Sequence, residues 1–161
     1  MKMSILLFAT VAGLGARPAS AQVMPAGENV ATAGASDLYE RTSSQIVLET
    51  TADPKVRDFA SMMLTAHVQS TADVEAAALK SKIKIAPPRL MPAQAEMIAQ
   101  LRAETGAARD AAYVAQRRAA HGQALSVQKA YAMDGAAPAL KQAAEKIVPV
   151  VEHHIVMLMP M

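Results

Sequence analysis

Three histidines occupy positions from which they could act together. His67, His121 and His154 each fall within a stretch of helical periodicity, on the stripe where apolar side chains recur every three or four residues. Such a stripe faces the core of a helical protein, so we expect the three imidazole rings to point inward from three different helices. Imidazole binds divalent metals and exchanges protons near neutral pH, and these are the two kinds of chemistry that the histidines offer.

Spacing along the chain indicates which of these residues could meet. Glu40 lies about 12 residues before the first expected turn and His67 about 15 residues after it, so at about 1.5 Å per residue both lie at nearly one height. Glu40 is about 60° from the centre of its helical stripe and can turn inward. A second turn is expected at Gly135, with His121 about 14 residues before it and His154 about 19 residues after it. This difference predicts that the two histidines are offset by about 7 Å along the axis of the bundle.

A metal site is one interpretation of these four residues. One carboxylate, from Glu40, and three imidazoles would suit a borderline divalent cation such as zinc, iron or manganese. The alternative is that they are polar core residues, hydrogen-bonded to one another or to Ser and Thr. A di-iron centre is disfavoured because it needs a Glu three residues before the ligating His, and these positions hold Leu64, Arg118 and Val151. No catalytic triad motif is present.

The C-terminal run is a second candidate for metal binding. It contains His153, His154, Met157, Met159 and Met161, whose imidazoles and thioethers suit Cu(I). Residues two apart on a helix point to different sides, so we expect Met157 and Met159 not to converge. Packing of the methionines in the core is therefore the favoured interpretation.

Helices must position all of these residues. The sequence lacks Trp and has only three Tyr and two Phe, whereas a sheet needs aromatic and β-branched side chains. Ala, Leu, Met, Gln and Lys favour helix instead. Caps, prolines and glycines delimit the expected elements. The expected elements are helices over 36–51 and 54–81, a loop over 82–91, a short helix from 92 to Gly106, a long helix over 107–133, and a last helix from 138, bent at Pro149.

The N-terminus has the pattern of an export signal. Lys2 precedes an apolar run over residues 5–14, and Ala19-Ser20-Ala21 is a pattern that signal peptidase accepts. We therefore expect a signal peptide over 1–21, cleavage before Gln22, and a periplasmic protein. A flexible leader over 22–35 and a helical domain over 36–161 would follow, with no membrane-spanning stretch in the mature chain.

Charge and cysteine content exclude several classes of function. Lys2 and Arg17 are two of 16 basic residues, so the mature chain has equal numbers of basic and acidic residues, 14 of each. A near-neutral chain with few aromatic residues gives no support to nucleic-acid binding. The chain has no Cys, which excludes disulfides, thiolate metal sites and a thiol nucleophile.

Several segments together resemble a known family. They are SSQIVLE, DPKVRDFASMMLTAH, the turn over 106–113, AAHGQAL and PVVEHH. In order and spacing they resemble domain-of-unknown-function family 4142, over about residues 37–158. The resemblance implies an exported bacterial protein with a ferritin-like bundle, and no assigned activity.

The resemblance also bears on the candidate site. The recurring histidines of the family fall on His67, His121 and His154, and its first-helix glutamate falls on Glu40. Ala66 stands where an acidic residue commonly precedes the second-helix histidine, so a partner of His67 is missing from that position.

These patterns together predict an all-α protein, a ferritin-like antiparallel four-helix bundle with one extra short helix. We expect an exported, non-enzymatic helper or metal-binding protein of the cell envelope. Two alternatives stay open: a mononuclear metal oxidoreductase, and a structural or interaction module that holds no metal.

Export predicts a processed N-terminus. Protein recovered from the cell envelope should begin at Gln22, because Ala19-Ser20-Ala21 provides the small residues that signal peptidase needs. Mass spectrometry of the intact chain measures this directly. Exported protein that still carried Met1 would contradict the prediction.

Overall fold

The computed structural model describes residues 23–161. This part of the chain is helical and contains no β-strand, as the composition predicts. The predicted signal peptide and its cleavage site before Gln22 lie outside the described residues. The helices are α1 (Ala26–Leu48), α2 (Pro54–Lys80), α3 (Pro92–Ala103), α4 (Gly106–Asp134) and α5 (Pro138–Leu158).

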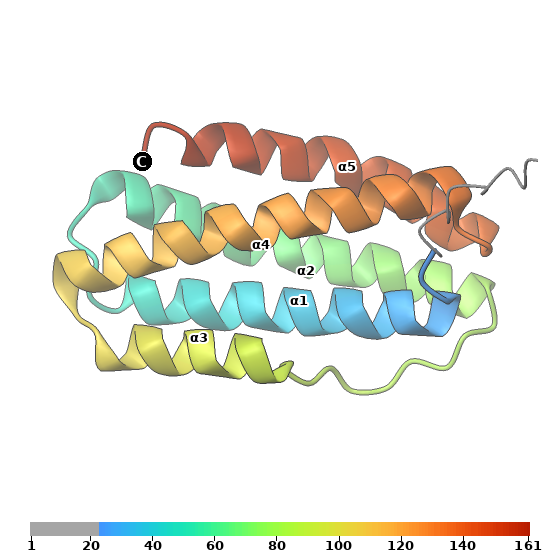
Figure 1. Cartoon of the computed structure of the whole chain (residues 1–161), viewed down its shortest axis with the longest axis horizontal. Helices are drawn as coiled ribbons and strands as arrows, with labels where there is room; N and C mark the ends of the chain where they lie inside the picture. Colours follow the sequence, from blue (N-terminus) through green and yellow to red (C-terminus); the bar gives the residue numbers. More distant parts are fainter. Residues whose placement is uncertain (1–22) are drawn as a thin grey trace, which may run out of the picture.

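The four long helices lie side by side and enclose a common core (Figure 1). The chain reverses between α1 and α2 and again between α4 and α5. α1 packs on α2, α2 on α5, α5 on α4 and α4 on α1, while the short helix α3 packs on α1 and α4 at one end of the molecule. Residues 81–91 cross from the end of α2 back along α1 to α3.

Local signals set most helix ends. The Asp53 side chain accepts hydrogen bonds from the backbone N–H groups of Lys55 and Val56, which caps α2 as predicted. Gly106 was expected to end the third helix, but α3 ends at Ala103 and Gly106 is the first residue of α4. Its φ of 54° lies in the left-handed region, where glycine costs least, and allows the sharp change of direction.

The first helix begins ten residues before the predicted start at Ser36. The segment over 22–35, predicted as a flexible leader, is helical from Ala26 onward. Val30 and Ala35 are buried, and Val30 packs against the core. Gly27 and Gly34 suggested a loop from local propensity alone, but burial of the neighbouring side chains outweighs that propensity.

Two apolar clusters fill opposite ends of the core. The aromatic-rich cluster includes Tyr39, Phe59 and Tyr113, and the Ala-rich cluster includes Ala77, Ala78, Ala143 and Ala144 in addition to Val30, Val74, Tyr131 and Leu140. The predicted stripes of α2 and α5 contribute to both clusters. The inward direction of these stripes is thereby confirmed.

Among residues 23–161, none of the helices combines the length and the apolar character that crossing a bilayer requires.

The same substitution at two positions of α2 tests the placement of its buried face. Val74 is 6% exposed and Val68 is 57% exposed. An unpaired carboxylate in the core costs about 3–5 kcal/mol, so Val74→Asp should lower the melting temperature by about 10 °C or more. Val68→Asp should change it by less than about 2 °C. Circular dichroism measures both, and equal shifts would mean that the buried face is wrongly assigned.

Candidate metal centre

A layer of buried polar side chains crosses the bundle between the two apolar clusters. Each long helix contributes to it where the helix passes from one cluster to the other. In α2, for example, His67 lies between Met63 of the aromatic-rich cluster and Val74 of the Ala-rich cluster. The layer consists of the buried residues Asp37 and Glu40 from α1, Arg117 and His121 from α4 and His154 from α5, together with the partly buried His67 from α2.

The three predicted histidines converge within this layer. One ring nitrogen from each of His67, His121 and His154 lies within 4.8 Å of the corresponding nitrogens of the other two. His121 Nε2 and His154 Nδ1 are 3.3 Å apart. Two nitrogens bound to one tetrahedral zinc at about 2.0–2.1 Å are about 3.3–3.4 Å apart. The two rings are hydrogen-bonded to each other, at a separation that two ligands of one ion would also have.

Hydrogen bonds orient two of the rings. His67 Nδ1 lies 2.6 Å from Asp37 Oδ1, and His121 Nδ1 lies 3.0 Å from the carbonyl oxygen of Arg117. Each Nδ1–H donates to its oxygen acceptor, so the proton is on Nδ1, and His121 Nε2 in turn accepts from His154 Nδ1. His67 Nε2 is buried and has no hydrogen-bond partner.

The offset of about 7 Å predicted between His121 and His154 is absent from the structure. The turn between α4 and α5 covers residues 135–137, so its centre lies one residue later than Gly135. Helical side chains also lean toward the N-terminus of their own helix. His121 therefore leans away from the turn and His154 leans toward it, which brings the two rings to one height.

Glu40 and Arg117 form a buried ion pair next to the histidines. Their side chains are 2% and 0% exposed, and Arg117 Nη1 donates to Glu40 Oε2. The guanidinium also lies over the rings of Tyr39 and Tyr113, at 4.2 and 5.1 Å from their centroids. Burial raises the pKa of the Glu40 carboxyl, but attraction to Arg117, His67 and His121 outweighs burial, so this pKa is lowered and Glu40 is charged.

Glu40 is therefore close to the histidines but already has a partner. Glu40 Oε2 lies 4.0 Å from His67 Nε2, as the predicted equal height requires, and Glu40 Oε1 lies 3.9 Å from His121 Nδ1. The group of donor atoms within 4.8 Å of one another consists of the three imidazoles. Whether Glu40 is itself a ligand stays a prediction.

The environment favours neutral imidazole at two positions. Burial lowers the pKa of His154 to about 4, and repulsion from His121 and His67 adds to this effect. Burial also lowers the pKa of His121, where Glu40 opposes the shift and Arg117 and His67 reinforce it. A metal can therefore bind these two rings near neutral pH without displacing a proton from a charged imidazole.

A pocket of about 240 Å³ between α2 and α5 leads from the surface to the cluster. His67 and His154 line its inner end, and small side chains such as Ala66 and Val150 line its walls. The pocket provides a route by which an ion or a small molecule could reach the histidines.

Sequence reasoning missed the side chains that hold His67. Asp37 was not singled out, although it lies three residues before Glu40 and therefore on the same face of α1. Thr71, one turn after His67, lies 2.9 Å from the second Asp37 oxygen. Although Ala66 stands where an acidic residue was expected, His67 thus has a carboxylate partner from another helix.

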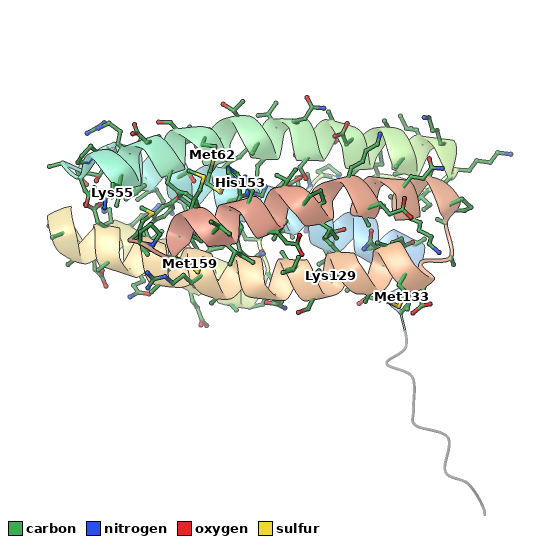
Figure 2. The ribbon with its side chains drawn as sticks, turned by 90° about the horizontal axis from the view of Figure 1, so that it is seen from above. Lys55, Met62, Lys129, Met133, His153 and Met159 are labelled. Carbon is green, nitrogen blue, oxygen red and sulfur yellow. The ribbon has the colours of Figure 1, made fainter. Side chains whose placement is uncertain are left out.

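The C-terminal methionines do not form a second cluster. Met157 and Met161 pack against the aromatic-rich cluster, whereas Met159 is 67% exposed. Figure 2 shows Met159 and His153 on the side of the molecule occupied by α5. Met157 and Met159 point apart, as the helical spacing predicts.

Comparison with known proteins agrees with the resemblance seen in the sequence. Residues 13–161 match the family described as Domain of unknown function (DUF4142). No curated protein and no solved structure matches the chain.

Removal of the Arg117 cation from its buried pair with Glu40 should lower the stability of the folded protein. Arg117→Gln leaves the Glu40 carboxylate buried without a charged partner, which should lower the free energy of unfolding by about 3–5 kcal/mol at pH 7. The control Arg102→Gln, at an exposed position of α3, should change it by less than about 0.5 kcal/mol. Chemical denaturation measures both.

The pH dependence of this loss identifies its cause. Without Arg117, burial should raise the pKa of Glu40 above its unfolded value, so the folded protein takes up a proton as the pH falls. The difference between variant and wild type should therefore shrink from pH 7 to pH 5, and the double variant Glu40→Gln/Arg117→Gln should recover part of the loss. A difference that is the same at both pH values would contradict a buried charge as the cause.

Proposed function

We propose that this chain, which belongs to the DUF4142 family, is an exported helical protein and binds one divalent metal ion. The proposed ligands are His67, His121 and His154, with Glu40 as a fourth ligand or as the neighbouring counter-charge. Zinc, iron and manganese are the candidate ions, because imidazole with carboxylate or water suits each of them.

The observation that carries this proposal is the state of His67. Its Nδ1 is held by Asp37, and its Nε2 is buried without a hydrogen-bond partner. A buried polar atom without a partner costs about 1–3 kcal/mol, so a protein that only needed a stable core would gain by replacing it. A metal ion bound by Nε2 would remove this cost, and the other two imidazoles stand within 4.8 Å.

Charge in the polar layer supports a cation as the ligand. The carboxylates of Asp37 and Glu40 bring two negative charges, and Arg117 brings one positive charge. These three side chains together carry a net charge of −1. A carboxylate that accepts from the second ring nitrogen of a ligand also fixes the ring and increases its basicity, which is the arrangement of Asp37 and His67.

The proposal also includes export of the protein and the ferritin-like arrangement of its four long helices. Lys2, the following apolar run and Ala19-Ser20-Ala21 support a signal peptide and a periplasmic protein. Four long helices with the metal residues on their inner faces are consistent with the ferritin-like bundle that the family resemblance implies.

The pocket between α2 and α5 favours a second candidate, a mononuclear metal oxidoreductase. Three protein ligands leave a coordination position open, and a reaction at the metal needs a path for a small reactant. The pocket ends at His67 and His154 and supplies such a path. Metal binding comes first in either case, so it is the property to measure.

Metal should stabilise the folded protein through the three histidines. Ligands from three helices meet only in the folded state, so metal at about 100 times its Kd should add about 2.7 kcal/mol. This corresponds to a rise of about 8 °C in melting temperature. His67→Ala, His121→Ala and His154→Ala should each abolish the rise at pH 7, measured by thermal unfolding with and without zinc, iron or manganese.

The matched control is His153→Ala. His153 is exposed and lies beside His154 on α5, so the control should keep the full rise. Comparison of Glu40→Gln/Arg117→Gln with Arg117→Gln separates the two roles of Glu40 without leaving Arg117 unpaired. Loss of a ligand should weaken metal binding, measured by calorimetry, far more than loss of a distant charge. If none of the ions changes the wild-type melting temperature, the histidines are polar core residues and the protein is a structural or interaction module.

A further inference from the structure

A second and larger cavity lies where α1, α2 and the segment over residues 81–91 meet. It has a volume of about 650 Å³ and is bounded by the first half of α1, by α2 and by the connecting segment that crosses α1 before α3 (Figure 1). Pockets for small organic ligands typically have volumes of about 300–1,000 Å³. The cavity is therefore large enough for a molecule well beyond the size of an ion.

The walls of this cavity are mainly apolar. Val30, Ala31 and Val74 line it from the helices, and Ile85 and Pro88 line it from the connecting segment. Pro88 approaches α1 so closely that its Cβ would lie 3.3 Å from a Cβ added at Gly34. Such walls bind an apolar body, such as a short alkyl chain, by removing it from water.

Three cations line the cavity, Arg41, Lys84 and Arg89, and none of them is in an ion pair among residues 23–161. Arg41 is the one of the three that is not exposed. It lies on α1, and its Nε is buried without a hydrogen-bond acceptor. Glu28 and Glu75 also line the cavity, but both are exposed and neither pairs with Arg41. The guanidinium is therefore available to an anion from outside the chain.

We propose that this cavity binds a small amphipathic carboxylate, with its alkyl chain between α1 and the connecting segment and its carboxylate on Arg41. The planar guanidinium can donate two parallel hydrogen bonds to a carboxylate. The apolar walls distinguish such a ligand from inorganic anions, which have no surface to bury. Lys84 and Arg89, on the connecting segment, line the same cavity, where with Arg41 they equal in number the carboxylates of Glu28, Asp37 and Glu75.

This site is separate from the metal centre but shares a wall with it. Asp37 and Thr71 line the cavity, and the same two side chains hold His67 in place. The proposed carboxylate site does not depend on metal binding, because Arg41 and the apolar walls are present without an ion.

Octanoate and octanol test the proposal with matched probes. They have the same alkyl chain and differ in charge. Titration calorimetry of the metal-free protein at pH 7 should show octanoate binding at least tenfold more tightly than octanol, because one end of octanoate binds the guanidinium. Equal affinities would overturn the proposal, since the cavity would then be only an apolar surface.

Two variants and a control locate the binding. Arg41→Gln should reduce octanoate affinity at least tenfold and leave octanol affinity unchanged. Ala31→Phe, which fills part of the cavity without altering charge, should weaken both probes. Arg102→Gln, an exposed cation on another helix, should change neither. The proposal fails if Arg41→Gln binds octanoate like the wild type, or if Arg102→Gln weakens octanoate binding equally.

Glycine amides provide a readout that does not depend on the variants. Gly27 and Gly34 line the cavity, whereas Gly122 and Gly135 lie on or next to α4, away from it. In NMR spectra of the labelled protein, octanoate should shift the first pair of amide resonances and leave the second pair in place. Shifts confined to the second pair, or absent from the first, would place the ligand elsewhere and overturn the proposal.

Discussion

The buried ion pair between Glu40 and Arg117 is the constraint on which the rest of the polar layer depends. Neither charge could remain in the core alone, because each would lose its hydration without compensation. The pair therefore fixes the distance and register between α1 and α4. It also sets the surroundings of the histidines, since the backbone carbonyl of Arg117 accepts from His121 and the Glu40 carboxylate lies 4.0 Å from His67.

The polar layer borders the two proposed sites, which differ in chemistry. On its inner side, three imidazoles are the proposed ligands of a cation. Between α1, α2 and the connecting segment, an apolar cavity lined by Arg41 is the proposed carboxylate site. Asp37 and Thr71 stand between them and belong to both. A ligand that moved Asp37 would also move His67, so the two sites can influence each other through a single side chain.

Most of the fold and the membership of the candidate site could be predicted from local signals. The cap at Asp53, the prolines at helix starts and the apolar spacing each depend on a few neighbouring residues, and the helices follow them closely. The early start of α1 could not be predicted in this way. Gly27 and Gly34 disfavour helix locally, and burial of Val30 in the Ala-rich cluster compensates for them.

The sequence by itself determined the helical class, the inward faces and the three histidines of the cluster, because periodicity is a property of each helix alone. Only the tertiary structure decided which atoms meet. The centre of the turn after α4 and the opposite lean of His121 and His154 close an offset that residue counting leaves open. The partners of His67 and Glu40 were decided in the same way. Asp37 and Arg117 reach them from other helices, and contacts between helices depend on packing that no single segment encodes.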